Sequence, residues 1–491
     1  MGVALQTAIG TTWAILWRTT LVLALVGGAL VWWMNRDTGW NAAEGYVAAG
    51  SVREQRVGLV ILAIAQPGRF DKAYWERVTG KILDKVVPWP INRIAVGDRG
   101  VVLVDPERPF APVAFTPRRL ADIDGHEADR DGTPWITRYR RGELEFVEPN
   151  SSMANDTGYF LYSGRRQGMT SAAAKIAAKA RYLYYGQLRD GYLPHGGQTR
   201  AFARDAITLL RQRHPQIVAA EFVETFDAAG KRAAVRRILD TGVDVLVLGS
   251  GQAVHSDFEE LRSGFSAIHA IVQEWRREHE NRPVRIAVAP WMATEPGFDA
   301  LWLDHFAASI PSATAPRQAA IGIVALHGLP PSMVGTDSWS QRWPATAARL
   351  KPRMAAILRS KGYSTVRVEA ASEAFADAVE DPENKIISVN ELYRAASARG
   401  DALAVALPIE FLAENTDTLF AHQAAFFAGI GGHRPYTPPP ADIDWRKAYV
   451  RTLKDGNTTM IYAGAPGGAV QPRASIVLAD AIGRVFPAPA Q

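Results

Sequence analysis

Short runs of consecutive apolar residues, each followed by a segment with helical spacing, recur along most of this sequence. The first run is Val57–Gly68 (VGLVILAIAQPG), and similar runs follow at Ile217–Val223, Val243–Gly249 and Val284–Trp291. A strand that is apolar at nearly every position is buried on both faces, as in parallel sheets that are covered by helices. The pattern therefore predicts an α/β fold built on a doubly wound parallel sheet.

A second series of the same kind begins near Ala315. Apolar strands are predicted at Ala320–Leu326 and Ala402–Phe411, with helices between and after them, including Thr416–Ala428 and Trp445–Gly456. At 491 residues the chain is also too long for one ordinary hydrophobic core. A second α/β unit is therefore expected in the carboxyl-terminal part of the chain.

We predict two similar doubly wound domains, residues 57–314 and 315–491, that face each other across a cleft. Residues 88–160 interrupt the first domain. They are rich in Pro, Gly, Asp and Arg with only short alternating runs, so a β-rich insertion is expected there. Ligands of open α/β sheets bind at the carboxyl ends of the strands, and the cleft is where we expect the functional site.

The amino-terminal segment has the composition of a membrane helix. Residues Thr11–Met34 are almost entirely apolar and carry tryptophans near both ends. At the rise of an α-helix they span about 36 Å, enough for one bilayer crossing. We predict a single-pass transmembrane helix at 11–34, a linker at 35–56 and a location in a bacterial inner membrane. A cleaved signal peptide is the alternative, and the basic residues on the two flanks do not decide the orientation.

The amino-acid composition excludes several kinds of functional site. The sequence has no cysteine, which excludes disulfides, thiolate catalysis and Cys-ligated metal sites, so a metal would need His, carboxylate or other oxygen ligands. The formal charge of +5 is spread along the chain, with no basic stripe and interleaved aromatic residues, so nucleic acid is not an expected partner. A mildly basic surface fits proximity to a membrane or an anionic ligand.

Three predicted strand ends carry residues suited to proton transfer or metal binding. They are His327 after one strand, Glu414, Asp417 and His422 after a second, and His255 and Ser256 after a third. Each has an ordinary structural explanation when it is considered alone, such as helix capping or a satisfied core histidine. The strands before His327 and before Asp417 belong to one predicted sheet, whose strand ends meet at one edge, so the histidine and the carboxylates together predict a site.

Several of these segments resemble those of ferrochelatases. ALHGLP (Ala325–Pro330) is similar to the segment usually written SAHSLP, and ALPIEFLAENTDTLF (Ala406–Phe420) is similar to PIxFxxDHxETLYE. VLGSGQAVHSDFEEL, which begins at Val247, resembles LPLYPQYSxxT. HGGQTRAFARDAI and APWMATEPGF resemble the family segments around it, so the similarity covers about residues 190–430.

The resemblance implies insertion of Fe²⁺ into a porphyrin, a step of heme biosynthesis. Fe²⁺ and the porphyrin are then substrates, no cofactor is required, and a bilayer is the expected third partner. The roles implied are catalysis and metal binding for His327 and Asp417, metal binding for His422, and substrate binding for His255, Ser256 and Glu414. Asp417 takes the place of the family's catalytic Glu, while His255 and Ser256 take the places of its Tyr and Ser.

The sequence also allows a second interpretation of the function. The last Glu of the family's ETLYE segment is Ala421 here, and residues 383–392 stand where a WLGP loop is expected. The chain is therefore also compatible with a non-catalytic, membrane-tethered protein that binds a tetrapyrrole or a metal. The sequence does not specify the oligomeric state.

Overall fold

The fold was analysed on a computed structural model of the 491-residue chain. It describes residues 2–35, 40–69, 193–257, 264–326, 339–372, 387–427 and 442–488, with shorter pieces at 71, 74, 77–78, 114–115, 144–147, 158–162, 261, 430 and 439–440. Within α1 (Gly2–Asn35) the side chains are described from residue 17 to residue 33.

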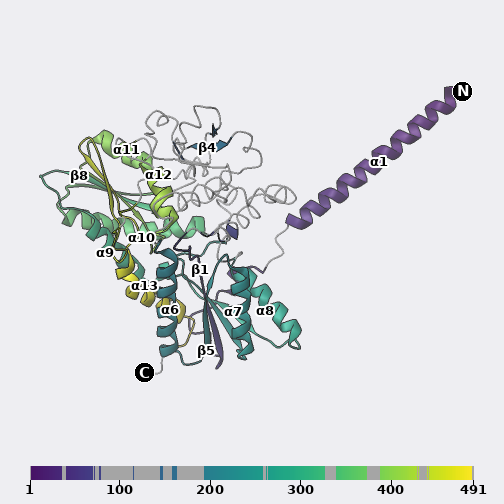
Figure 1. The fold of residues 1–491 in the computed structure, drawn as a ribbon, viewed down its shortest axis with the longest axis horizontal. Helices are drawn as coiled ribbons and strands as arrows, with labels where there is room; N and C mark the ends of the chain where they lie inside the picture. Colours follow the sequence, from purple (N-terminus) through teal and green to yellow (C-terminus); the bar gives the residue numbers. More distant parts are fainter. Residues whose placement is uncertain are drawn as a thin grey trace.

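The first sheet is wholly parallel and buried on both faces. Its strands, in spatial order, are β5 (Ile217–Glu224), β1 (Val57–Ala63), β6 (Val245–Ser250) and β7 (Arg285–Val288). Every residue of β1 is buried, because alternate side chains point to helices on opposite faces. Val60 and Leu62 pack toward α7 (Ala228–Asp240) and α8 (Ser266–Glu278), whereas Leu59 and Ile61 pack toward α6 (His195–Arg213). Figure 1 shows these helices around the strands.

The second sheet is parallel except at one edge. Its strands, in spatial order, are β11 (Arg451–Asp455), β12 (Thr458–Tyr462), β10 (Leu403–Pro408), β8 (Ala319–Leu326) and β9 (Thr365–Ser372). One face packs on α9 (Pro296–Ser309) and α10 (Trp339–Ser360). The other face packs on α11 (Val389–Arg399) and α12 (His422–Phe426). The prediction of an α/β fold with two mainly parallel sheets is therefore confirmed.

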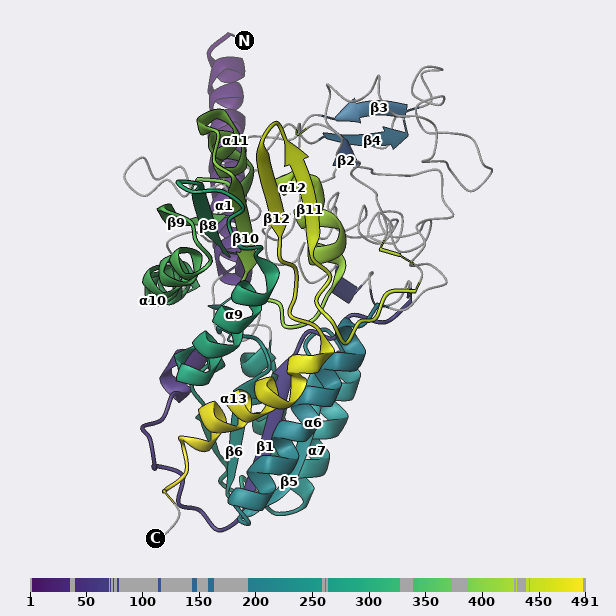
Figure 2. The same cartoon turned by 90° about the vertical axis from the view of Figure 1, so that its left-hand side faces the viewer.

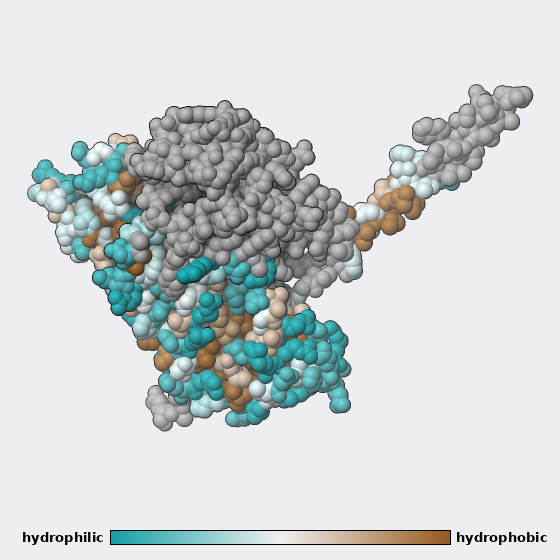
Figure 3. Space-filling view, in the orientation of Figure 1, coloured by the Kyte–Doolittle hydropathy of each residue, from teal (hydrophilic) through white to brown (hydrophobic). Residues whose placement is uncertain are grey.

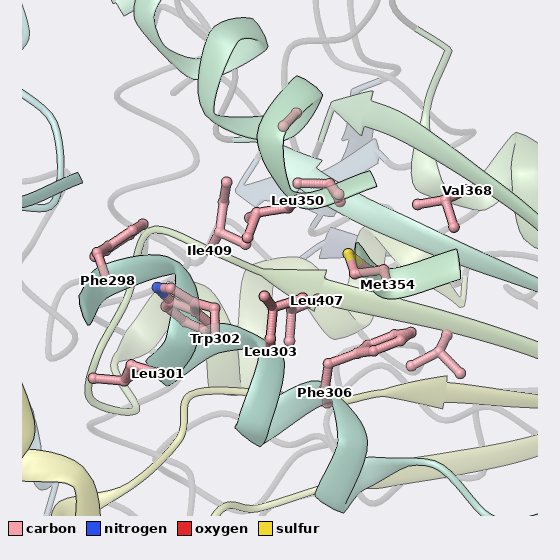
Figure 4. Close-up of a cluster of buried hydrophobic side chains, with 14 of the residues drawn as sticks. Phe298, Leu301, Trp302, Leu303, Phe306, Leu350, Met354, Val368, Leu407 and Ile409 are labelled. Atoms are coloured by element: carbon pink, nitrogen blue, oxygen red, sulfur yellow. The ribbon is translucent and has the colours of Figure 1, made fainter. Parts of the chain in front are cut away.

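Two helices pack against the sheet that does not belong to their own half of the sequence. Phe298, Trp302 and Phe306 of α9 lie in the core of the second sheet, as Figure 4 shows, although α9 precedes residue 315. The last helix, α13 (Gln471–Gly483), returns to the first sheet and lies beside α6. Its apolar residues face both cores, so α13 joins the two sheets (Figure 2).

One predicted helix is a strand. Residues 445–456 were expected to be helical, but Arg451–Asp455 form β11, which pairs antiparallel with β12. The two strands join at Gly456, whose φ of +57° suits a tight turn that glycine adopts without strain. The side chain of Arg451 points into the protein and is buried, which a surface helix would not require.

Three short strands fall within or next to the predicted insertion. They are β2 (Ala114–Phe115), β3 (Leu144–Val147) and β4 (Gly158–Tyr162), in the antiparallel order β2-β4-β3. The other residues of the predicted insertion at 88–160 lie outside the described residues, so a β-rich insertion over this whole range stays a prediction.

The amino-terminal segment is helical, as predicted, and α1 projects away from the sheets (Figure 1). Its described side chains, from residue 17 to residue 33, are all exposed, and Figure 3 shows apolar residues among them. Within the part of the chain that the structure describes, no helix combines the length and apolar character needed to cross a bilayer. The membrane crossing of residues 11–34 stays a prediction.

The segment expected to be a linker is folded onto the first sheet from Trp40 onward. Trp40 stacks on His269 with ring centroids 4.8 Å apart, and its carbonyl accepts a hydrogen bond from Ser266 Oγ at 2.8 Å. Tyr46 forms a parallel bridge to Val288 at the edge of the sheet. Val52 is fully buried, and its N–H donates to the carbonyl of Val485 at 2.9 Å. These contacts make the segment part of the domain.

Two truncations should therefore behave differently. Removing residues 1–36 is expected to leave a folded protein with an unchanged unfolding midpoint, because among the described residues the first that is seen to pack against the sheet is Trp40. Removing residues 1–56 should cost at least about 1.5–3 kcal/mol of stability, the value of burying one side chain such as Val52. Urea unfolding followed by circular dichroism compares the two proteins. Equal midpoints would show that residues 40–56 are a linker after all.

Candidate functional site

The carboxyl ends of the two sheets meet through the loops that follow β1 and β10. Gln66 lies after β1, and Thr416 lies after β10. Thr416 donates to Gln66 Oε1 twice, from its backbone N–H at 3.0 Å and from its Oγ1 at 3.2 Å. Both residues are buried. The edges at which α/β proteins bind their ligands are thus in direct contact, with Asp417 next in the chain after Thr416.

His195 joins this junction from the first turn of α6. The backbone N–H of Gln66 donates to His195 Nδ1 at 3.2 Å, which places the ring proton on Nε2. Burial lowers the pKa of His195 to about 4, with the negative charge of Asp417 opposing the shift and the positive charge of Arg200 adding to it. His195 is therefore neutral at pH 7, and its ring lies close enough to Asp417 for the two side chains to interact electrostatically.

Glycine at position 196 allows this close approach. A Cβ atom there would lie 2.2 Å from the carbonyl oxygen of Gln66, too close for any other residue without movement of the backbone. The start of α6 is therefore packed directly against the loop after β1.

Asp417 begins an unusual turn. Residues Asp417–Ala421 form one turn of π-helix, a geometry found frequently at functional sites, and α12 follows. Asn415 Oδ1 accepts from the backbone N–H groups of Asp417 at 2.7 Å and Thr418 at 3.1 Å. Thr418 Oγ1 accepts from the N–H of Asn415 at 2.9 Å. The backbone at Asp417 is thus fixed by its own loop as well as by Gln66.

Glu414, predicted to bind substrate, is engaged within the protein. It is 1% exposed, and its Oε1 accepts from Arg451 Nη1 at 2.8 Å and from the backbone N–H of Ala465 at 3.0 Å. The Arg451 guanidinium also donates to the carbonyl of Thr418 at 2.7 Å. Glu414 and Arg451 therefore tie the Asp417 loop to the turn between β12 and α13.

His422, predicted to bind metal, lies at the start of α12 and is buried. Its Nδ1 is 2.8 Å from Tyr462 Oη, and its ring stacks on Phe426 at 5.2 Å. Among the described residues, no group of three or more His, Asp or Glu side chains is arranged to hold a metal ion. These contacts support a packing role for His422, and metal binding by it stays a prediction.

His255 and Ser256 follow β6 and are buried. His255 Nδ1 is 2.6 Å from Tyr46 Oη, and Arg342 Nη1 donates to the His255 carbonyl at 2.7 Å. The Arg342 guanidinium lies 4.3 Å from the centre of the Trp291 ring. Burial, with a contribution from Arg342, lowers the pKa of His255 to about 3, so its ring is neutral. His255 thus connects the amino-terminal segment, the first sheet and α10.

His327 lies outside the described residues. The strand before it, β8, runs to Leu326 and lies beside β10, with Ala325 opposite Pro408. The strand ends that precede His327 and Asp417 in the sequence are therefore neighbours in one sheet.

The sequence reading missed a titratable group at the end of β5. Glu224 is partly buried: its Oε2 accepts from the N–H of Phe226 at 2.8 Å, and its Oε1 is enclosed with no hydrogen-bond partner among described residues. Burial raises the pKa of Glu224 to about 7, although nearby backbone N–H groups and the Lys231 ammonium act in the opposite direction. The signal was the glutamate at the last position of the strand IVAAEFVE.

Replacing Glu224 with glutamine should change how stability depends on pH. Because the pKa of Glu224 is about 7 in the folded state and about 4.5 otherwise, its contribution is most favourable below pH 4.5 and is lost as the pH rises to 7. Relative to the wild type, Glu224→Gln should therefore gain up to about 3 kcal/mol between pH 4.5 and pH 8. Urea unfolding at both pH values measures this change.

Glu221→Gln on the same strand is the matched control, because that carboxylate is near the surface and paired with Arg237. Parallel pH profiles for the wild type and Glu224→Gln would show that Glu224 titrates normally.

A scan against protein-family models and a search of curated proteins both found no match to the chain.

Proposed function

We propose that this protein inserts Fe²⁺ into a porphyrin at the junction between its two sheets, the reaction of the ferrochelatases that its segments resemble. The observation that supports the proposal best is the contact of Gln66 with Thr416, which brings together the carboxyl edges of both sheets beside Asp417. Fe²⁺ and the porphyrin are substrates in this proposal, and no cofactor takes part.

Metal insertion requires that two pyrrole protons leave and that the cation exchanges its water for nitrogen ligands. Asp417 can bind the cation through oxygen or accept a proton, and a carboxylate suits both tasks. His327 would accept protons as a neutral imidazole. His195 does not act as a base through Nδ1 in this scheme, because that atom already accepts from Gln66. Its neutral ring lies near the Asp417 carboxylate and interacts with it electrostatically.

The proposal includes a location at a membrane. The exposed part of α1 carries large apolar side chains, among them Trp17, Leu23, Leu25, Trp32 and Trp33. Contact of these side chains with lipid would remove them from water, and a porphyrin that partitions into lipid would then be close to the enzyme.

The geometry also supports a second candidate, a non-catalytic tetrapyrrole- or metal-binding protein. Glu414, His255 and His422 are all buried and hydrogen-bonded within the protein. A protein that only holds a tetrapyrrole needs fewer groups that exchange protons or ligands with the metal.

Zinc insertion into protoporphyrin separates the two candidates. The full chain in detergent is mixed with protoporphyrin and Zn²⁺, and formation of the zinc porphyrin is followed by its fluorescence. The enzyme should form many zinc porphyrins per protein, and Asp417→Ala should not. Quenching of porphyrin fluorescence on binding, with no insertion above the rate without protein, would leave the binding protein as the better account.

A further inference from the structure

The side chain of Gln66 has no role in the proposed proton transfer or metal binding, yet it is buried and hydrogen-bonded at the junction of the two sheets. It is 8% exposed, and all three of its described hydrogen bonds lie at the junction: two at Oε1 from Thr416 and one from its N–H to His195. Because Oε1 must face the two Thr416 donors, the orientation of the side-chain amide is determined.

We infer that Gln66 is a positioning residue that sets the place of the Asp417 carboxylate from the opposite sheet. The inference rests on the proposed function and adds a residue to it. Gln66 Oε1 accepts hydrogen bonds from the backbone N–H and from the Oγ1 of Thr416. Because Thr416 directly precedes Asp417, these two bonds also fix the start of the π-helical turn. Asn415 fixes the backbone of Asp417 by a hydrogen bond within the loop itself. Gln66 fixes the position of this loop relative to the first sheet.

His195 keeps Gln66 in place. Its Nδ1 accepts from the Gln66 N–H, and Gly196 lets the start of α6 approach the Gln66 carbonyl. The loop after β1 is therefore held by α6 on one side and holds the Asp417 loop on the other. Displacement of a reacting group by about 1 Å can cost roughly 100-fold in rate, so a small shift here would matter to catalysis.

The decisive variant is Gln66→Met, which keeps the size of the side chain and removes the acceptor. It should lower kcat for zinc insertion by roughly 10–100-fold and change KM for protoporphyrin by less than about 3-fold. Amide hydrogen exchange at Thr416 should speed up, because the acceptor of its N–H is gone. Thr416→Ser, which keeps both donors, should retain the wild-type kcat.

Gln198→Met is the matched control. Gln198 also forms a hydrogen bond between distant parts of the chain, from Nε2 to the Trp445 carbonyl at 2.9 Å, but it makes no described contact with the Asp417 loop. It should change kcat by less than about 3-fold. The inference is overturned if Gln66→Met keeps the wild-type kcat, loses no more than Gln198→Met, or leaves exchange at Thr416 unchanged. A wild type without insertion activity would refute the proposed function. The hydrogen-exchange result would then show by itself whether Gln66 fixes the loop that carries Asp417.

Discussion

Replacing Arg451 with leucine is expected to lower the free energy of unfolding by about 3–5 kcal/mol, because it leaves the buried carboxylate of Glu414 without its partner. Both side chains are buried, and the guanidinium also holds the carbonyl of Thr418 and lies 4.3 Å from the centre of the Tyr462 ring. Urea unfolding at pH 7 measures the change.

Two further variants show whether the loss comes from the unpaired charge. Arg446→Leu removes an arginine from an exposed pair with Asp444 and should leave the unfolding midpoint unchanged. Glu414→Leu combined with Arg451→Leu should recover much of the lost stability, because two apolar residues leave no buried charge. A single Arg451→Leu protein as stable as the wild type would show that the pair does not support the fold.

Asp417→Ala is expected to lower the rate of metal insertion by roughly 10²–10⁴-fold, the range for a group that moves protons in the transition state. His327→Ala should have a similar effect on the rate. Asp417→Glu restores the residue found in the ferrochelatase segment and should keep activity. Zinc insertion and urea unfolding are measured on the same preparations.

The opposite pattern would contradict these roles. If Asp417→Ala or His327→Ala proteins lose stability but keep the specific activity of the wild type in their folded fraction, the residue is structural. The binding protein would then be the better account.

The buried strands were predictable from sequence because their apolar character does not depend on distant residues. β1, β6 and β10 are buried throughout, and all their residues except Ser250 at the end of β6 are apolar. β11 was not predictable in this way. Its residues, RTLKD, have no apolar run, and its strand geometry depends on pairing with β12 and on a buried partner for Arg451.

Helix packing between the two halves could not be predicted from the pattern of each half. α13 is apolar on two faces, which shows that it is buried but not which sheet lies on each side. The same holds for α9, which is buried around most of its circumference. Sequence order therefore suggested two separate halves, whereas α13 connects both cores.

For the candidate site, strand ends were the useful signal. They led to the loop of Asp417, which the structure places at the junction of the two sheets. They could not indicate Gln66 or His195. A glutamine after β1 and a histidine at the start of a helix can be recognised as part of the site only from their contacts, which are made with residues distant in the sequence. Nor could they show that Glu414 is paired with Arg451, which is distant in the sequence.

The most direct test is insertion of the proposed metal itself. The full chain in detergent is mixed with protoporphyrin and excess Fe²⁺ without oxygen, and heme formation is followed by absorbance in the wild type and in Asp417→Ala. The proposal predicts many hemes per wild-type protein, at a rate that saturates with porphyrin, and a rate near that without protein for Asp417→Ala. Porphyrin binding without heme formation above the rate without protein, or equal turnover by both proteins, would contradict it.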